Sequence, residues 1–143
     1  MTEQKHFSVI RPTVETPYHI DFDWWKEHDS NWHVFLFSCL CPEHQAAFQH
    51  EPVETKIDWV DPFSGEVREV DGLQTTLMNH CVLEPGFLTA NTAMIDAIFR
   101  VFLSNGNHPM CPLELSDKIG KSADIILRTL SGLQVYKGIR PSR

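Results

Sequence analysis

The stretch from residue 111 to residue 130 constrains the fold most strongly, because a glycine turn separates two short amphipathic patterns. Pro112 suits the first turn of a helix, where no backbone donor is needed. Leu115 and Ile119 lie four residues apart and therefore share one face of that helix. Gly120 tolerates the left-handed conformation in which helices commonly end. These residues predict a helix that closes in a tight turn.

A second helix is predicted directly after the turn. Ser122 is a favoured N-cap residue, and Ile126 and Leu130 are spaced to face inward. Asp124 and Arg128 then face outward. Helix, glycine turn and helix at this spacing form the helix-turn-helix pattern.

A further helix is predicted upstream, so that three helices pack together. Thr89 is a suitable N-cap residue for it, and Asn105-Gly106 marks its end. The apolar residues between them follow helical spacing along one stripe: Met94, Ile95, Ile98, Val101 and Phe102.

The segment from Thr89 to Arg143, about the last 55 of 143 residues, resembles a winged-helix domain. Its middle is similar to the helix-turn-helix of bacterial transcriptional regulators. The resemblance implies a regulatory role in which the helix after the turn enters the major groove of duplex DNA. The sequence leaves the oligomeric state open, with a homodimer as one option. The candidate DNA contacts on this helix and its turn are Lys121, Ser122, Asp124, Arg128 and Thr129.

The wing of that family corresponds here to residues 134–140. We expect a short hairpin that turns at Lys137-Gly138, since the sequence stops at Arg143. Lys137 and Arg140 are the candidate contacts to flanking phosphates, so the predicted DNA-binding region spans residues 121–140.

Charge is unevenly distributed along a chain whose net charge is −7. Residues 1–88 contain 15 acidic and 5 basic side chains, whereas residues 89–143 contain 4 acidic and 7 basic ones. Phosphate contact requires local rather than overall basic charge, so only the C-terminal part suits DNA. The acidic N-terminal half and the short wing favour an alternative, in which the same three helices bind a protein partner.

The chain carries no signal for a membrane or for secretion. No run approaches the ~20 apolar residues of a membrane helix, and the polar start, Met1 to His6, does not resemble a signal peptide. Four cysteines, at positions 39, 41, 81 and 111, are too sparse for a secreted disulfide framework. We therefore expect a cytoplasmic protein with reduced thiols or a metal site, and no membrane partner.

Residues 1–86 are predicted to form a small strand-rich module, which Pro85-Gly86 separates from residues 87–143. The first twenty residues are expected to begin as an irregular arm. The aromatic run from His33 to Ser38 favours a buried strand.

A hairpin and a short helix are expected to follow. The alternation of Val53, Thr55, Ile57 and Trp59 with charged residues predicts a strand, the turn chemistry of residues 61–66 reverses the chain, and residues 67–70 return as its partner. Asp71 can cap the short helix, which carries Leu73 and Leu77 on one face.

Cysteine and histidine recur at a spacing that is typical of metal sites. Cys41 and His44 have the C-x2-H spacing of a metal knuckle, and His80-Cys81 follows about 36 residues later. Two sulfurs and two nitrogens are a ligand set that tetrahedral zinc favours, with Cys39 as a substitute for one of them. Adjacent helical residues point about 100° apart, so His80 and Cys81 can share one ion only where the helix ends.

The alternative interpretation needs no metal. Cys81 then extends the Leu73-Leu77 stripe as a small buried hydrophobe, and His44 and His80 are surface residues. A metal with four protein ligands has no open position, so its role would be structural.

The sequence therefore predicts an α+β protein in two parts, a strand-rich module with a zinc site and a three-helix, winged-helix-like unit. DNA binding in a regulatory setting and protein interaction are the two functions left open. No phosphate-binding loop or nucleophile elbow is present, and no arrangement of residues indicates an enzyme.

Overall fold

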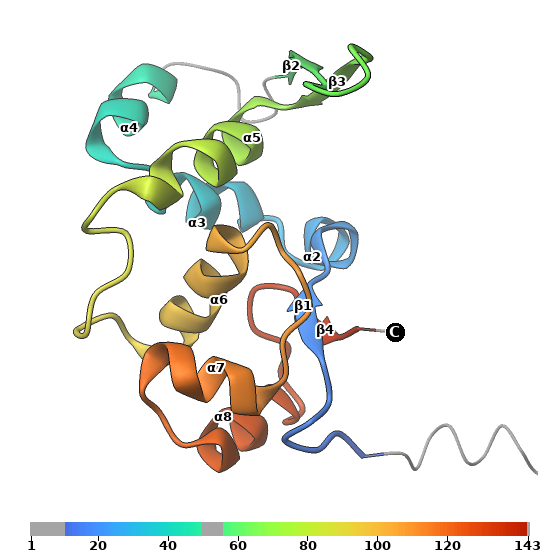
Figure 1. Cartoon of the computed structure of the whole chain (residues 1–143), viewed down its shortest axis with the longest axis vertical. Coiled ribbons are helices and arrows are strands. Elements are labelled where there is room, and N and C mark those ends of the chain that lie inside the picture. The colour runs from blue at the N-terminus through green and yellow to red at the C-terminus, as the bar shows by residue number, and fades with distance from the viewer. Residues whose placement is uncertain (1–10, 50–55, 143) are drawn as a thin grey trace, which may run out of the picture.

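The computed structural model describes residues 11–49 and 56–142, in which helices alternate with two short antiparallel sheets (Figure 1). The α+β class predicted from the sequence is confirmed. In chain order, the elements are β1 (Tyr18–Ile20), α2 (Phe22–His28), α3 (Trp32–Ser38), α4 (Pro42–Phe48), β2 (Lys56–Val60), β3 (Val67–Asp71), α5 (Gly72–Asn79), the 3-10 helix η1 (Cys81–Leu83), α6 (Met94–Ser104), α7 (Pro112–Ile119), α8 (Ala123–Leu130) and β4 (Ile139–Pro141). None of the helices in the described residues is long and apolar enough to cross a membrane.

The prediction of a strand at residues 33–38 is wrong, because this segment is helix α3. Trp32, His33 and Leu36 are its buried residues, and they recur at helical spacing. Aromatic and branched residues favour strands only where a sheet is available to receive them. Together with α2, α4 and α5, this helix makes the first part of the chain mainly helical rather than strand-rich.

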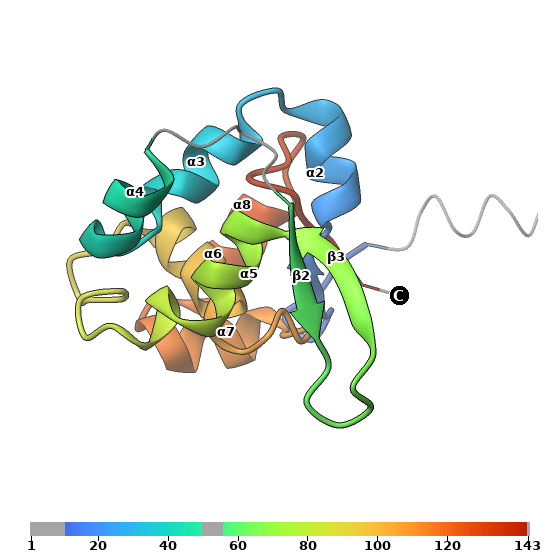
Figure 2. The ribbon, with the colours of Figure 1, turned by 90° about the horizontal axis from the view of Figure 1, so that it is seen from above.

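The predicted hairpin and the helix after it are confirmed. β2 pairs with β3 in antiparallel register, with Val60 opposite Val67, and the hairpin projects from the upper end of the molecule (Figures 1 and 2). Residues 53 and 55, which belonged to this prediction, lie outside the described residues. Asp71 caps α5 by accepting a hydrogen bond from the backbone N–H of Gln74. Leu73 and Leu77 are buried, as predicted.

Tyr18–Ile20, the last residues of the segment that was expected to begin as an irregular arm, form strand β1, whereas residues 1–10 of that segment lie outside the described residues. β1 pairs with β4, with His19 opposite Arg140, so the first and last strands of the described chain lie side by side (Figure 1). Asn107 also binds the end of β1. Its side-chain amide donates a hydrogen bond to the Ile20 carbonyl and accepts one from the Ile20 N–H.

Buried side chains from both predicted parts form one hydrophobic cluster. Tyr18, Leu36 and Leu77 from residues 1–86 belong to it, as do Ile98 and Ile126 from residues 87–143. Each of these five is no more than 1 % exposed. The two parts of the chain therefore pack against each other through a shared core.

The three C-terminal helices lie where the sequence predicts them, except for one boundary. Pro112 starts α7, Gly120 ends it with a φ of 75°, and the Ser122 hydroxyl caps α8. The predicted Thr89 cap is wrong, because α6 begins at Met94. The Thr89 N–H instead bonds the hydroxyl of Thr92 and closes a local turn.

The expected wing hairpin is only partly present. Lys137 and Gly138 adopt positive φ values of 53° and 74°, and the Ile139 N–H bonds the Tyr136 carbonyl across the turn. The strand after this turn does not return along residues 134–136, because β4 pairs with β1. The N-terminal part thus supplies the partner strand that the sequence assigned to a local hairpin.

Candidate metal centre and nucleic-acid interface

The start of α4 places one sulfur and one imidazole nitrogen on the same side of the helix. Cys41 occupies the N-cap position, Pro42 the first helical position and His44 the third. An N-cap side chain reaches over the third helical position, as in a capping box. The Cys41 Sγ accordingly lies 3.1 Å from Nδ1 of His44.

The end of α5 supplies two further candidate ligands. Helix α5 ends at Asn79, and His80 leaves the helical conformation with φ −132° and ψ −58°. This break removes the 100° separation that an ideal helix imposes on neighbours. Cys81 Sγ lies 3.5 Å from Cys41 Sγ and 3.5 Å from His44 Nδ1, and the His80 ring packs edge-on against that of His44, with centroids 4.4 Å apart.

The four predicted ligands are therefore brought together. One ligand atom from each of Cys41, His44, His80 and Cys81 lies within 4.8 Å of the others, so the cluster could hold a metal ion. Cys39, the predicted substitute, is buried nearby but is not part of the cluster.

Burial raises the pKa of two thiols in this region. Cys81 is fully buried, and burial raises the pKa of its thiol to about 11. Burial likewise raises the pKa of the Cys39 thiol. A thiolate is the form that ligates a metal, so a divalent cation here would supply the charge that the surroundings lack.

The candidate DNA contacts on α8 present an exposed face. Lys121, Asp124 and Arg128 are exposed, while Ile126 and Leu130 are buried on the opposite side, as the sequence predicts. The Ser122 hydroxyl accepts from the N–H groups of Asp124 and Ile125. The hydroxyl of Thr129 donates to the Ile125 carbonyl and is half-buried.

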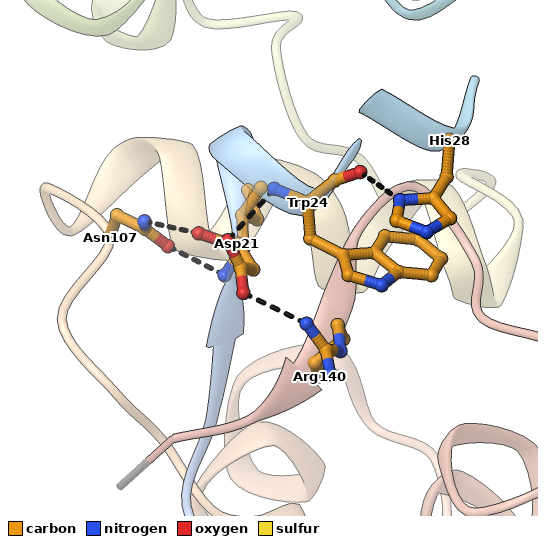
Figure 3. A network of polar contacts seen from close by, with 6 residues as sticks. Asp21, Trp24, His28, Asn107 and Arg140 are labelled. Atoms are coloured by element: carbon orange, nitrogen blue, oxygen red, sulfur yellow. Dashed lines mark hydrogen bonds and ion pairs between the residues drawn. The ribbon is translucent and has the colours of Figure 1, made fainter. Parts of the chain in front are cut away.

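Lys137 and Arg140, the candidate phosphate contacts, are engaged with aromatic rings of the N-terminal part. The Lys137 ammonium lies 4.2 Å from the centre of the Phe35 ring. The Arg140 guanidinium lies 5.0 Å from the Trp24 ring and donates to the Asp21 carboxylate at 3.1 Å (Figure 3). Both cations therefore have partners within the fold.

Two polar arrangements were not predicted from the sequence. His28 stacks on Trp24 with ring centroids 4.0 Å apart, and its Nδ1 lies 2.7 Å from the Trp24 carbonyl (Figure 3). His33 and Asp71 form a buried pair, with Nε2 3.1 Å from Oδ2. The four-residue spacing of Trp24 and His28 was a usable signal for the first, whereas no local pattern links His33 to Asp71.

Comparison of the chain with protein-family models, with curated proteins and with solved structures gave no match.

Proposed function

We propose that this chain is a zinc-stabilised, DNA-binding regulatory protein, in which Cys41, His44, His80 and Cys81 hold a structural zinc ion. The zinc proposal rests on the distances between the sulfur and nitrogen atoms of the candidate ligands. Tetrahedral zinc with its usual bond lengths separates two sulfurs by about 3.8 Å, and a sulfur from a nitrogen by about 3.5 Å. The corresponding separations here are 3.5 Å between the sulfurs and 3.1 and 3.5 Å between sulfur and nitrogen.

Zinc suits this cluster better than a hard cation does. Both sulfur ligands are cysteines, and no carboxylate belongs to the group. Thiolate and imidazole select zinc over magnesium or calcium, which prefer oxygen. The role is structural because four protein ligands leave no position for a substrate.

DNA binding is proposed for the exposed face of α8. The supporting observation is the α7–turn–α8 unit, which buries Ile126 and Leu130 and leaves Arg128 and Lys121 in solvent. Lys121 directly precedes the N-cap of α8 and is exposed, which suits contact with a phosphate. Arg128 would read a base edge, while Lys121 would contact the backbone.

A fluorescence anisotropy titration with a random duplex pool at low salt tests this function. Arg128→Ala should weaken binding by about 1–3 kcal/mol if Arg128 contacts a base. Arg68→Ala is the charge-matched control, because Arg68 is exposed on β3 at the opposite end of the long axis (Figure 1). Equal losses in both variants, or no binding by folded protein at about 100 μM, would contradict DNA recognition by α8.

A protein partner is the second candidate function, and exposed apolar side chains favour it. Leu113 is 46 % exposed, Ile125 47 % and Leu133 107 %. The intramolecular contacts of Lys137 and Arg140 also reduce the cationic surface that is free for phosphate. In this case Ile125→Ser should abolish partner binding while leaving zinc content unchanged.

A further inference from the structure

Two thiols of the candidate metal centre are close enough to react with each other. The Sγ atoms of Cys41 and Cys81 lie 3.5 Å apart, which is non-bonded contact. A disulfide requires about 2.0 Å between the sulfurs, so a movement of about 1.5 Å would join them. Cys41 precedes α4 and Cys81 follows the end of α5, so both belong to chain segments outside regular helix interiors.

A cavity lies beside both cysteines. It has a volume of about 240 Å³ and is lined by Cys41, Cys81, Cys39, Phe87 and Arg100, among others. A molecule of the size of water occupies about 30 Å³ in the liquid, so hydrogen peroxide fits this space. Cys41 is 8 % exposed and Cys81 0 %, so a reagent reaches Cys41 first.

We propose that Cys41 and Cys81 are an oxidation site for peroxides, at which disulfide formation expels the metal ion. The inference rests on the proposed zinc site. The Cys41 thiolate attacks one peroxide oxygen, the O–O bond breaks, and a sulfenic acid and a hydroxide ion form. The Cys81 thiolate then attacks the Cys41 sulfur, which forms the S–S bond, breaks the S–O bond and releases a second hydroxide ion.

The electrons and ligands balance in this sequence. The two sulfurs together lose two electrons, and the peroxide gains them and leaves as two hydroxide ions. Neither sulfur remains a thiolate, so the metal keeps only the two imidazoles and is released. Reduction of the disulfide regenerates both ligands, which makes the site reversible.

The consequence is a redox-dependent attachment of α4. In the reduced, metal-bound state four ligands tie the start of α4 to the end of α5. After oxidation a single covalent link between Cys41 and Cys81 replaces them, and His44 and His80 are released from the metal. Peroxide thus exchanges one cross-link for another at the same place in the fold.

The test treats purified, metal-loaded, full-length protein with hydrogen peroxide. Metal release is followed with a chromogenic chelator, and disulfides are mapped by peptide mass spectrometry. We expect one metal ion released per Cys41–Cys81 disulfide formed, and recovery of metal binding after dithiothreitol and added zinc.

Cys39→Ser is the matched control, because Cys39 lines the same cavity without belonging to the ligand cluster. This variant, and likewise Cys111→Ser, should release metal and form the same disulfide at the rate of the unmodified protein. A disulfide that maps to Cys39, or metal release accompanied only by sulfinic acids, overturns the inference. Retention of the metal under peroxide that oxidises Cys111 also overturns it. Protein that contains no metal before peroxide is added instead contradicts the proposed zinc site itself.

Discussion

Gly138 is the residue at which the backbone leaves no room for a side chain. A Cβ atom there would lie 2.7 Å from the Cβ of Trp25 and 3.1 Å from the carbonyl oxygen of Asp21. The φ of Gly138 is also 74°, a region that costs other residues about 1–2 kcal/mol. We predict that Gly138→Ala lowers the free energy of unfolding by about 2–5 kcal/mol, because overpacking adds to the backbone cost.

Gly120 provides the control for this prediction. Its φ of 75° is nearly the same, but nothing lies within 4 Å of a Cβ built on it. Gly120→Ala should therefore cost only the backbone strain, about 1–2 kcal/mol. Chemical denaturation of both variants measures the difference, and equal losses would show that β4 and α2 are not packed as closely as described.

Asp71 performs two roles through its two carboxylate oxygens. Oδ1 accepts from the Gln74 N–H at 2.8 Å and caps α5, and Oδ2 lies 3.1 Å from Nε2 of buried His33. We predict that Asp71→Ala lowers the free energy of unfolding by about 3 kcal/mol or more, because it also leaves His33 unpaired. Asp71→Asn keeps an oxygen for the cap and should cost less. A loss of about 1 kcal/mol for Asp71→Ala, the value of a cap alone, would mean that the His33 contact contributes nothing.

Interactions of single residues could be predicted from the sequence where the partners are close neighbours in the chain. The caps at Asp71 and Ser122 and the turn at Gly120 all follow from a few neighbouring residues. The His33–Asp71 pair joins residues 38 positions apart. No local pattern specifies such a pair, so only the folded arrangement reveals it.

Helix α4 is the element that depends most on the candidate metal centre. None of its residues is buried, and Phe48 only packs partly against the core. Gln45 donates hydrogen bonds to the carbonyls of Ser38 and Leu40, and in the proposed zinc site the four ligands would be the main further attachment of this helix. We predict that removing the metal with a chelator speeds hydrogen exchange at the α4 amides by at least about tenfold, which corresponds to 1.4 kcal/mol of lost local stability.

Helix α6 is the internal reference for this measurement. It buries six residues, namely Ala97, Ile98, Phe99, Val101, Phe102 and Leu103. Its amides should keep their protection when the metal is removed at a temperature where the protein stays folded. Unchanged exchange at α4, or an equal increase at α6, would contradict the role of the metal as a local attachment.

Whole elements were predicted correctly where the hydrophobic periodicity was strong, and wrongly where the prediction relied on composition. Strong periodic stripes gave α6, α7 and α8 correctly, and alternation gave the β2–β3 hairpin. The segment 33–38 has strand-like composition but folds as α3, which buries Trp32, His33 and Leu36 on one helical face. The cluster of candidate metal ligands was predicted from spacing alone, and the break of α5 at His80 is what brings both His80 and Cys81 to it.

Residues 1–86 and residues 87–143, which the sequence divides into two parts, share one core. This shared core has a measurable consequence for how the whole molecule unfolds. The last strand, β4, pairs with β1, and one hydrophobic cluster contains side chains from both parts. Pairing between distant segments cannot be seen in local patterns, which is why the sequence assigned the strand after Gly138 to a local wing. A shared core predicts that both parts unfold in one cooperative transition.

Tryptophan fluorescence tests this prediction, because all four tryptophans lie in the first part, at positions 24, 25, 32 and 59. Ile126 lies in the second part, on α8, and is 0 % exposed. Ile126→Ala should lower the free energy of unfolding by about 2–5 kcal/mol through the cavity it creates. If both parts unfold in one cooperative transition, the fluorescence transition reports the full loss of the free energy of unfolding.

Leu77→Ala, a buried truncation within the first part, is the matched control and should shift the same transition. If Ile126→Ala leaves the fluorescence midpoint unchanged while lowering the helical signal in circular dichroism, the two parts unfold independently, and the core they share contributes little to either.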